Sequence, residues 1–160
     1  LPLQDMHRDI IAVRASSSMP LVSRNVKING ELYLDGGISD SIPIRQSIRD
    51  GNGKNVVVMT KEEGYVRKPA GPELAAVRAK YLRYPKVYVL MRERHLSYNN
   101  TVQYIEEKAE NGEVFVIRPK RASKVGRVEM DKERLTALYE EGYRDAEDCY
   151  LDLLEYLERA

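Results

Sequence analysis

The chain has 160 residues, which is long enough for one domain with a sizeable hydrophobic core. Its 26 Lys and Arg residues nearly balance its 25 Asp and Glu residues, so it lacks the basic excess that nucleic-acid binding needs. The single cysteine, Cys149, excludes an internal disulfide framework and fits a reducing compartment. No apolar run approaches the roughly 18 residues of a membrane span, and no signal-peptide pattern is present. We therefore expect a cytoplasmic protein that binds no nucleic acid.

The first part of the chain predicts an α/β fold. Its expected elements are a helix at 7–15, strands at 26–28 and 31–34, a short helix at 42–49 and a strand at 55–60. Asn29-Gly30 is a strong two-residue hairpin signal, so we expect the first two strands to pair antiparallel. The strand at 55–60 is a nearly continuous apolar run, which is typical of strands buried on both faces of a sheet. Because the chain begins at Leu1, close to a predicted helix, we expect it to be part of a longer protein.

The rest of the chain predicts mostly helix. Helices are expected at 72–82, 86–94, 97–111, 131–142 and 143–158, and a strand at 113–117. The segment 86–94 fits a helix or a strand, and Pro85 favours the helix because proline suits a first helical turn. Asp131 is the predicted N-cap of its helix, with Met130 and Leu135 placed as a hydrophobic staple. In the last helix, the side chains expected to point inward are Ala146, Tyr150, Leu153, Leu154 and Leu157.

A change of composition near residues 119–130 marks the expected domain boundary. The stretch 120–127 is rich in Lys and Arg and predicts an exposed basic loop. Contact with anionic lipid head groups is the alternative to a plain solvated loop. We therefore expect residues 1–118 to form the α/β part and residues 119–160 to form a basic loop with a helical extension.

Asp35 is the residue best suited to catalysis. It follows a predicted strand and precedes Gly36 and Gly37. Because glycine permits backbone angles that other residues avoid, the chain can turn sharply beside the carboxylate, and a β-branched side chain would be strained if either glycine holds a positive φ. Such a turn would aim one acid at a neighbouring group. An ordinary Asp-Gly turn at a strand end is the alternative.

Other chemistry-bearing residues form no complete site. His7 and His95 fall short of the usual three or four metal ligands, and His95 is expected at a solvated helix end, so we expect no metal and no cofactor. The stretch 51–54 lacks the spacing of a phosphate-binding loop and precedes a strand. Cys149 is expected to be a small buried residue of the last helix. Tyrosines cluster around the middle helices and are expected at the edge of the core, with an acyl-substrate lining as the alternative: Tyr81, Tyr84, Tyr88, Tyr98 and Tyr104.

The Ala-Ser-rich turn with a proline at 15–21 precedes a strand that ends in Asp-Gly-Gly, followed by Asp-Ser-Ile-Pro at 40–43 and a buried strand ending in Thr60. In this order, these segments resemble the patatin-like phospholipases. Three later segments resemble the region after the core in a bacterial branch of the family: 83–85, 94–99 and 114–119. The resemblance covers most of the chain and is most specific over residues 14–60.

The resemblance implies the C-terminal part of a three-layer α/β/α domain with a helical C-terminal extension. It also implies that Asp35 is the acid of a Ser-Asp dyad, supported by Gly36 and Gly37, with no catalytic histidine. The family's Gly-x-Ser-x-Gly elbow and its glycine-rich oxyanion loop come earlier in the family's order. The nearest match here, residues 37–41, lacks the second glycine and directly follows the aspartate motif. We therefore expect no nucleophile in this chain.

The implied function is hydrolysis of a phospholipid, a lysophospholipid or another acyl ester by the full-length parent. The nucleophilic serine would come from the upstream half of the same protein, and the 160-residue chain alone would be inactive. Such an enzyme of lipid degradation would be cytoplasmic or peripheral at a membrane surface. The alternative is a non-catalytic module of the same fold that binds a lipid or a partner.

Overall fold

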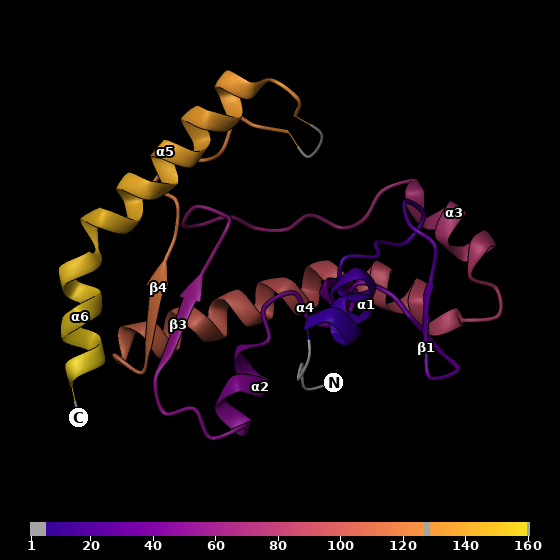
Figure 1. Cartoon of the computed structure of the whole chain (residues 1–160), viewed down its shortest axis with the longest axis horizontal. Helices are drawn as coiled ribbons and strands as arrows, with labels where there is room; N and C mark the ends of the chain where they lie inside the picture. Colours follow the sequence, from indigo (N-terminus) through magenta and orange to yellow (C-terminus); the bar gives the residue numbers. More distant parts are fainter. Residues whose placement is uncertain (1–5, 127–128, 160) are drawn as a thin grey trace. The chain divides into compact units, whose positions relative to one another are not determined.

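The computed structural model describes residues 6–126 and 129–159 (Figure 1). The described elements, in chain order, are α1 (Met6–Ser16), β1 (Val26–Ile28), β2 (Glu31–Tyr33), the 3-10 turn η1 (Gly36–Ile38), α2 (Ile44–Arg49), β3 (Asn55–Val58), α3 (Glu73–Lys80), α4 (Pro85–Glu110), β4 (Val114–Ile117), α5 (Lys132–Asp148) and α6 (Tyr150–Glu158). The fold is therefore mixed α/β, as predicted, and its described strands form two small sheets. None of the described helices combines the length and the apolar character that crossing a bilayer requires.

The chain divides into two compact units. One unit combines the chain up to Ile42 with Arg67–Thr101, and the other combines Pro43–Val66 with the chain from Val102 onward. Each unit has its own small core. Buried apolar residues of the first are Ala15, Val26, Val77, Tyr81 and Tyr98; those of the second include Ile44, Val57, Ile105, Val114 and Tyr156.

The hairpin of the first unit confirms the sequence prediction. β1 and β2 pair antiparallel, with Val26 opposite Tyr33 and Ile28 opposite Glu31. Asn29 and Gly30 have φ angles of 50° and 89°, so both central residues of the turn have the positive φ of a type I′ hairpin. Helix α1 packs beside β1. The hairpin therefore fixes the course of the backbone that leads into Asp35.

The sheet of the second unit corrects one prediction. β3 and β4 pair in parallel, and the pairing extends to the N–H of Met59, which donates to Ile117 O at 2.8 Å. Val57 is buried, whereas its neighbour Val58 is 71% exposed. The expectation that this strand is buried on both faces is therefore wrong for the described chain. A sheet of two strands is covered on one face here, and alternate side chains point to the other face.

The middle of the chain forms one long helix. The choice of helix over strand at 86–94 is confirmed, but α4 continues without a break to Glu110, where the sequence predicted two helices. Residues 86–110 contain neither Gly nor Pro, so nothing in the backbone chemistry interrupts the helix. His95 consequently lies within α4, and the prediction of a helix end there is wrong.

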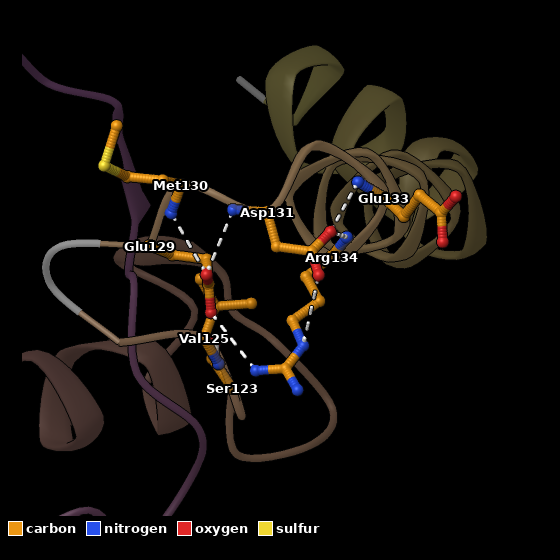
Figure 2. Close-up of polar contacts among 7 residues, drawn as sticks. All are labelled: Ser123, Val125, Glu129, Met130, Asp131, Glu133 and Arg134. Atoms are coloured by element: carbon orange, nitrogen blue, oxygen red, sulfur yellow. Dashed lines mark hydrogen bonds and ion pairs between the residues drawn. The ribbon is translucent and has the colours of Figure 1, made fainter.

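The C-terminal helices begin where predicted but break elsewhere. Asp131 caps α5, and its Oδ1 accepts the N–H groups of Glu133 at 2.9 Å and Arg134 at 3.2 Å (Figure 2). Helix α5 passes through Gly142, the predicted end, and the break falls at Cys149. A helix-ending glycine usually adopts positive φ, and Gly142 does not.

The predicted packing of these helices is also corrected. Met130 is 87% exposed, so it forms no hydrophobic staple with Leu135. Of the side chains expected to point inward from the last helix, three are exposed: Tyr150, Leu154 and Leu157. Tyr156 is instead the buried residue of α6. The helical pattern predicted the element correctly but not the face that is covered.

Candidate functional site

Asp35 lies at the end of the hairpin and caps the turn η1. Its Oδ1 accepts the N–H of Gly37 at 2.7 Å. Its own N–H donates to Ser18 O at 2.8 Å, and the Ser18 hydroxyl donates to Arg14 O at 2.7 Å. Ser18 is buried, and Asp35 is half-buried. The structure therefore joins the serine-rich turn after α1 directly to the Asp-Gly-Gly turn.

Gly37 is the centre of this turn. Its carbonyl oxygen accepts two side-chain donors, Arg94 Nε at 2.7 Å and Ser41 Oγ at 2.8 Å. A Cβ atom at position 37 would lie 3.0 Å from Asp35 Oδ1 and 3.4 Å from Arg94 Nη2. Both distances are tight for a carbon atom, so any side chain at this position would push the carboxylate or the guanidinium away.

Gly36 has a different environment. No heavy atom lies within 4 Å of the place where its Cβ would be. Neither Gly36 nor Gly37 is among the described glycines with positive φ. The turn therefore uses no positive φ at either glycine. The constraint at Gly37 is instead the close approach of the Asp35 and Arg94 side chains to the Cβ position.

A groove of about 470 Å³ runs beside the turn. Small and apolar residues of α1 and of the hairpin line it, among them Val13, Ser16, Tyr33 and Gly36. The groove therefore reaches the residue next to Asp35. Its lining would accept an apolar chain more readily than a charged group.

The remaining sequence candidates make other contacts. His95 Nδ1 is 3.1 Å from Arg92 O, one turn earlier in α4, and the side chain of His7 lies outside the described part. Lys54 donates from Nζ to Leu157 O, so the stretch 51–54 is a loop that contacts α6. Cys149 is half-buried between α5 and α6, which corrects its expected position within the last helix. Across residues 6–126 and 129–159, no group of three or more His, Cys, Asp or Glu could hold a metal ion.

The tyrosines divide between core and surface. Tyr81 and Tyr98 are buried, which confirms the core-edge interpretation for these two, whereas Tyr84 is exposed. The guanidinium of Arg67 lies 4.1 Å from the ring centre of Tyr98. In the other unit, the guanidinium of Arg45 lies 3.8 Å from the ring centre of Tyr104. Each of these two rings therefore packs against the guanidinium of an arginine.

The basic stretch 120–127 is partly held against α5. Lys120 donates from Nζ to Asp148, and this hydrogen-bonded ion pair raises the pKa of Lys120. Its N–H donates to Asp145 Oδ2 at 3.2 Å. Arg121 and Lys124 are exposed, and Arg127 lies outside the described residues. The first lysine of the stretch is therefore paired with protein acids.

A second polar cluster follows the basic stretch (Figure 2). Glu129 Oε1 accepts the N–H groups of Met130 at 3.0 Å and of Asp131 at 3.1 Å. Arg134 Nη1 lies 3.4 Å from Glu129 Oε2. The backbone N–H of Asp131 is the largest cause that lowers the pKa of Glu129, followed by that of Met130. This cluster fixes the entry into α5 and contains no group poised for catalysis.

No sequence signal of its own points to a role for Arg94. This residue lies 57 positions after Gly37, and no spacing rule connects two residues so far apart. It occurred only as the first residue of the segment 94–99, which resembles a bacterial branch of the patatin-like family. The hydrogen bond from Arg94 to Gly37 forms only in the folded protein, where this part of α4 lies against the turn in the first unit.

Comparison with known proteins relates the two ends of the chain to different families. Residues 5–48 match the model of the patatin-like phospholipases, and residues 84–158 match a domain of unknown function, DUF6363. The uncharacterized protein YjjU of Escherichia coli (strain K12) is 31% identical over 120 residues, which cover 74% of this chain and 33% of YjjU. The aligned part of the chain thus spans about a third of that relative's length. The N-terminal part of the chain is therefore similar to patatin-like phospholipases, and its C-terminal half is similar to DUF6363.

Proposed function

We propose that this chain is the part of a patatin-like serine acyl hydrolase that supplies Asp35 as the acid of a Ser-Asp dyad. The observation that carries the proposal is the fixed carboxylate of Asp35, which lies in the segment similar to patatin-like phospholipases. Among the described contacts of this carboxylate, the hydrogen bond from Gly37 engages Oδ1. Oδ2 is then the oxygen that would accept a proton.

The proposed reaction uses a serine from the upstream part of the parent protein. Its hydroxyl oxygen attacks the ester carbonyl carbon while its proton passes to Asp35. The tetrahedral intermediate collapses to an acyl-enzyme, and Asp35 returns the proton to the departing alcohol. Water then attacks the acyl-enzyme, giving its proton to Asp35, which reprotonates the serine as the fatty acid leaves. A glycine-rich loop of the upstream part would hold the oxyanion.

The serines near Asp35 support an external nucleophile. Four of them have hydroxyl groups that donate to carbonyl groups three or four residues earlier: Ser17 to Val13 O, Ser18 to Arg14 O, Ser39 to Gly36 O and Ser41 to Gly37 O. A hydroxyl that caps its own backbone is a structural group. The proposal therefore places the attacking serine outside these turns.

Exposed apolar side chains support a larger domain. On α1, Ile10 is 57% exposed and Val13 is also exposed, and on β3 Val56 and Val58 are exposed. Parallel strands are normally covered on both faces, and an amphipathic helix normally buries its apolar stripe. We propose that the upstream part of the parent covers these faces and completes a three-layer α/β/α domain, with residues 119–160 as its extension. The substrate would be a phospholipid, a lysophospholipid or another acyl ester.

The decisive test is Asp35→Asn in the full-length parent. Asparagine keeps the shape of the side chain but cannot take up the proton, so we expect kcat/KM for p-nitrophenyl butyrate to fall about 100-fold or more, or about 3 kcal/mol. The matched control is Asp40→Asn, which changes an exposed carboxylate in the same loop and should leave the rate within about twofold. The circular dichroism spectra of wild type, Asp35→Asn and Asp40→Asn should be the same.

Two further results would contradict the proposal. The first is an Asp35→Asn parent whose activity stays within a few-fold of wild type, since Asp35 would then be only a turn residue. The second is hydrolysis by the 160-residue chain alone, with fluorophosphonate labelling at Ser16, Ser17, Ser18 or Ser39. A parent that binds phospholipid vesicles but lacks any esterase activity would favour the non-catalytic module.

A further inference from the structure

We infer that Arg94 is a positioning residue that fixes the Asp35 carboxylate, an inference that rests on the proposed role of Asp35. Arg94 lies in α4, within residues 84–158 that match the domain of unknown function DUF6363. Asp35 lies within residues 5–48, which match the patatin-like phospholipases. The inference thus gives the DUF6363 segment a specific task, namely to hold the catalytic turn of the patatin-like segment.

Two hydrogen bonds connect Arg94 to the carboxylate through a single residue. Arg94 Nε donates to Gly37 O at 2.7 Å, and Gly37 N donates to Asp35 Oδ1 at 2.7 Å. The backbone of Gly37 is therefore held on both sides of its Cα atom. Because the glycine has no side chain, Arg94 Nη2 and Asp35 Oδ1 both come within contact distance of the Cβ position. If Arg94 moved away, the carbonyl of the peptide group next to the one that orients Asp35 would lose its charged donor and keep only Ser41 Oγ.

The part of α4 that carries Arg94 is itself anchored. One turn further along the helix, Tyr98 is buried, and the next residue, Asn99, pairs with the backbone of Arg67. Its Oδ1 accepts the Arg67 N–H at 2.9 Å, and its Nδ2 donates to Arg67 O at 3.1 Å. Arg94 is half-buried between this anchor and the turn. Its guanidinium thus reaches Gly37 from a fixed element of the same unit.

A Ser-Asp dyad makes this positioning consequential. With no histidine between serine and acid, the proton passes directly to the carboxylate, so the reaction depends on the exact separation of the two oxygens. A misplacement of about 1 Å can reduce a rate about 100-fold. A residue that fixes the carboxylate should therefore affect kcat, whereas a residue that binds substrate should affect KM as well.

The test compares Arg94→Gln, Arg94→Lys and the control Arg92→Gln in the full-length parent. Arg92 is an exposed residue of the same helix that pairs with Glu93. For Arg94→Gln we expect kcat to fall about 10- to 100-fold with KM within about threefold of wild type. In Arg94→Gln, the backbone amides of residues 37–40 should exchange hydrogen about tenfold faster than in wild type, because the turn loses one hydrogen bond from a charged group. Arg94→Lys keeps a cationic donor and should recover part of kcat, and Arg92→Gln should resemble wild type.

The outcomes separate this inference from the proposed function. Unchanged exchange in Arg94→Gln would overturn the positioning role whatever the activity. Faster exchange with unchanged kcat in an active parent would also overturn it, because the turn would then not govern catalysis. If Arg94→Gln fails to fold, Arg94→Lys decides the matter by the same two measurements. An inactive wild-type parent would remove the proposed function and, with it, the catalytic part of this inference.

Discussion

The Asp-Gly-Gly turn and the C-terminal helices are held in opposite ways. The turn is short, yet groups from two other places in the chain, Ser18 and Arg94, hydrogen-bond to it, and Ser41 of the same loop adds a further hydrogen bond. Helix α5 has 17 residues, and none of them is buried. Its polar contacts lie at the surface, near its first turn and along the basic stretch. A substitution should therefore cost much more in the turn than in α5.

The turn and the C-terminal helices also differ in the kind of interaction that holds each of them to the rest of its unit. The turn has little apolar surface to bury, and hydrogen bonds from distant segments determine its shape. The C-terminal helices have many apolar side chains, but in the described chain one of them, Tyr156, is buried. The helices thus depend on a single anchor where a packed helix would normally have several. Substitutions can test both parts of this comparison.

The largest effect is expected at Gly37, and its neighbour Gly36 provides the control. Gly37→Val would place a branched side chain where even a Cβ lies 3.0 Å from Asp35 Oδ1. We expect a loss of about 1–3 kcal/mol in stability from this overpacking and a fall of about 100-fold in the esterase rate of the parent. The Cβ atom of Gly36→Val meets no heavy atom within 4 Å, and the stability of this variant should stay within about 0.5 kcal/mol of wild type. Melting temperature and rate are measured together; equal behaviour of the two variants would mean that the turn is not constrained as described.

The next effect tests the single anchor of the C-terminal helices. The Tyr156 hydroxyl accepts the N–H of Asn55 at 3.0 Å and donates to Glu113 O at 2.9 Å, so it bridges the starts of β3 and β4. Tyr156→Phe leaves a donor and an acceptor without this partner and should reduce the free energy of unfolding by about 1–3 kcal/mol. Tyr150→Phe makes the same chemical change on an exposed ring of the same helix and should have little effect. If urea unfolding gives Tyr156→Phe and Tyr150→Phe the same free energy of unfolding, the hydroxyl of Tyr156 does not anchor the C-terminal helices.

A smaller effect is expected at the N-cap of α5. Asp131→Ala removes the acceptor for the N–H groups of Glu133 and Arg134 and should cost about 1 kcal/mol. Asp131→Asn keeps a side-chain oxygen and should stay close to wild type, because the exposed ion pair with Arg134 contributes little. Urea unfolding and helical circular dichroism measure the change. If Asp131→Ala and Asp131→Asn have the same free energy of unfolding, the side-chain cap does not contribute to the stability of α5.

These regions also differ in how far the sequence predicts them. The hairpin at Asn29-Gly30 and the N-cap at Asp131 were predicted correctly because their signals are local. The buried faces of β3 and α6 were not predicted correctly, because they depend on which other elements pack against this strand and this helix. The contact of Arg94 with Gly37 could not be predicted, since its partners are 57 residues apart and a glycine shows no preference for an arginine. The motif indicated Asp35, but the reason for Gly37 became visible only in the folded turn.

The smallest effect concerns pH and the entry into α5. The pKa of Glu129 is lowered from its ordinary value of about 4.5, mainly because its carboxylate accepts the N–H of Asp131. A carboxyl group with a lower pKa in the folded than in the unfolded state stabilises the fold above the unfolded pKa. That contribution is lost as the pH falls through the folded value.

Glu129→Gln should therefore be slightly less stable than wild type at pH 7, and the difference should shrink as the pH is lowered below about 4.5. The control is Glu140→Gln, which changes an exposed glutamate of α5. Unfolding in urea at pH 7 and at successively lower pH values measures both differences. A Glu129→Gln difference that stays constant across this range would show that the charge of Glu129 does not stabilise the start of α5. The surface cluster would then hold the helix by its neutral hydrogen bonds alone, which would widen the contrast with the Asp35 turn, where Arg94 supplies a charged donor to Gly37.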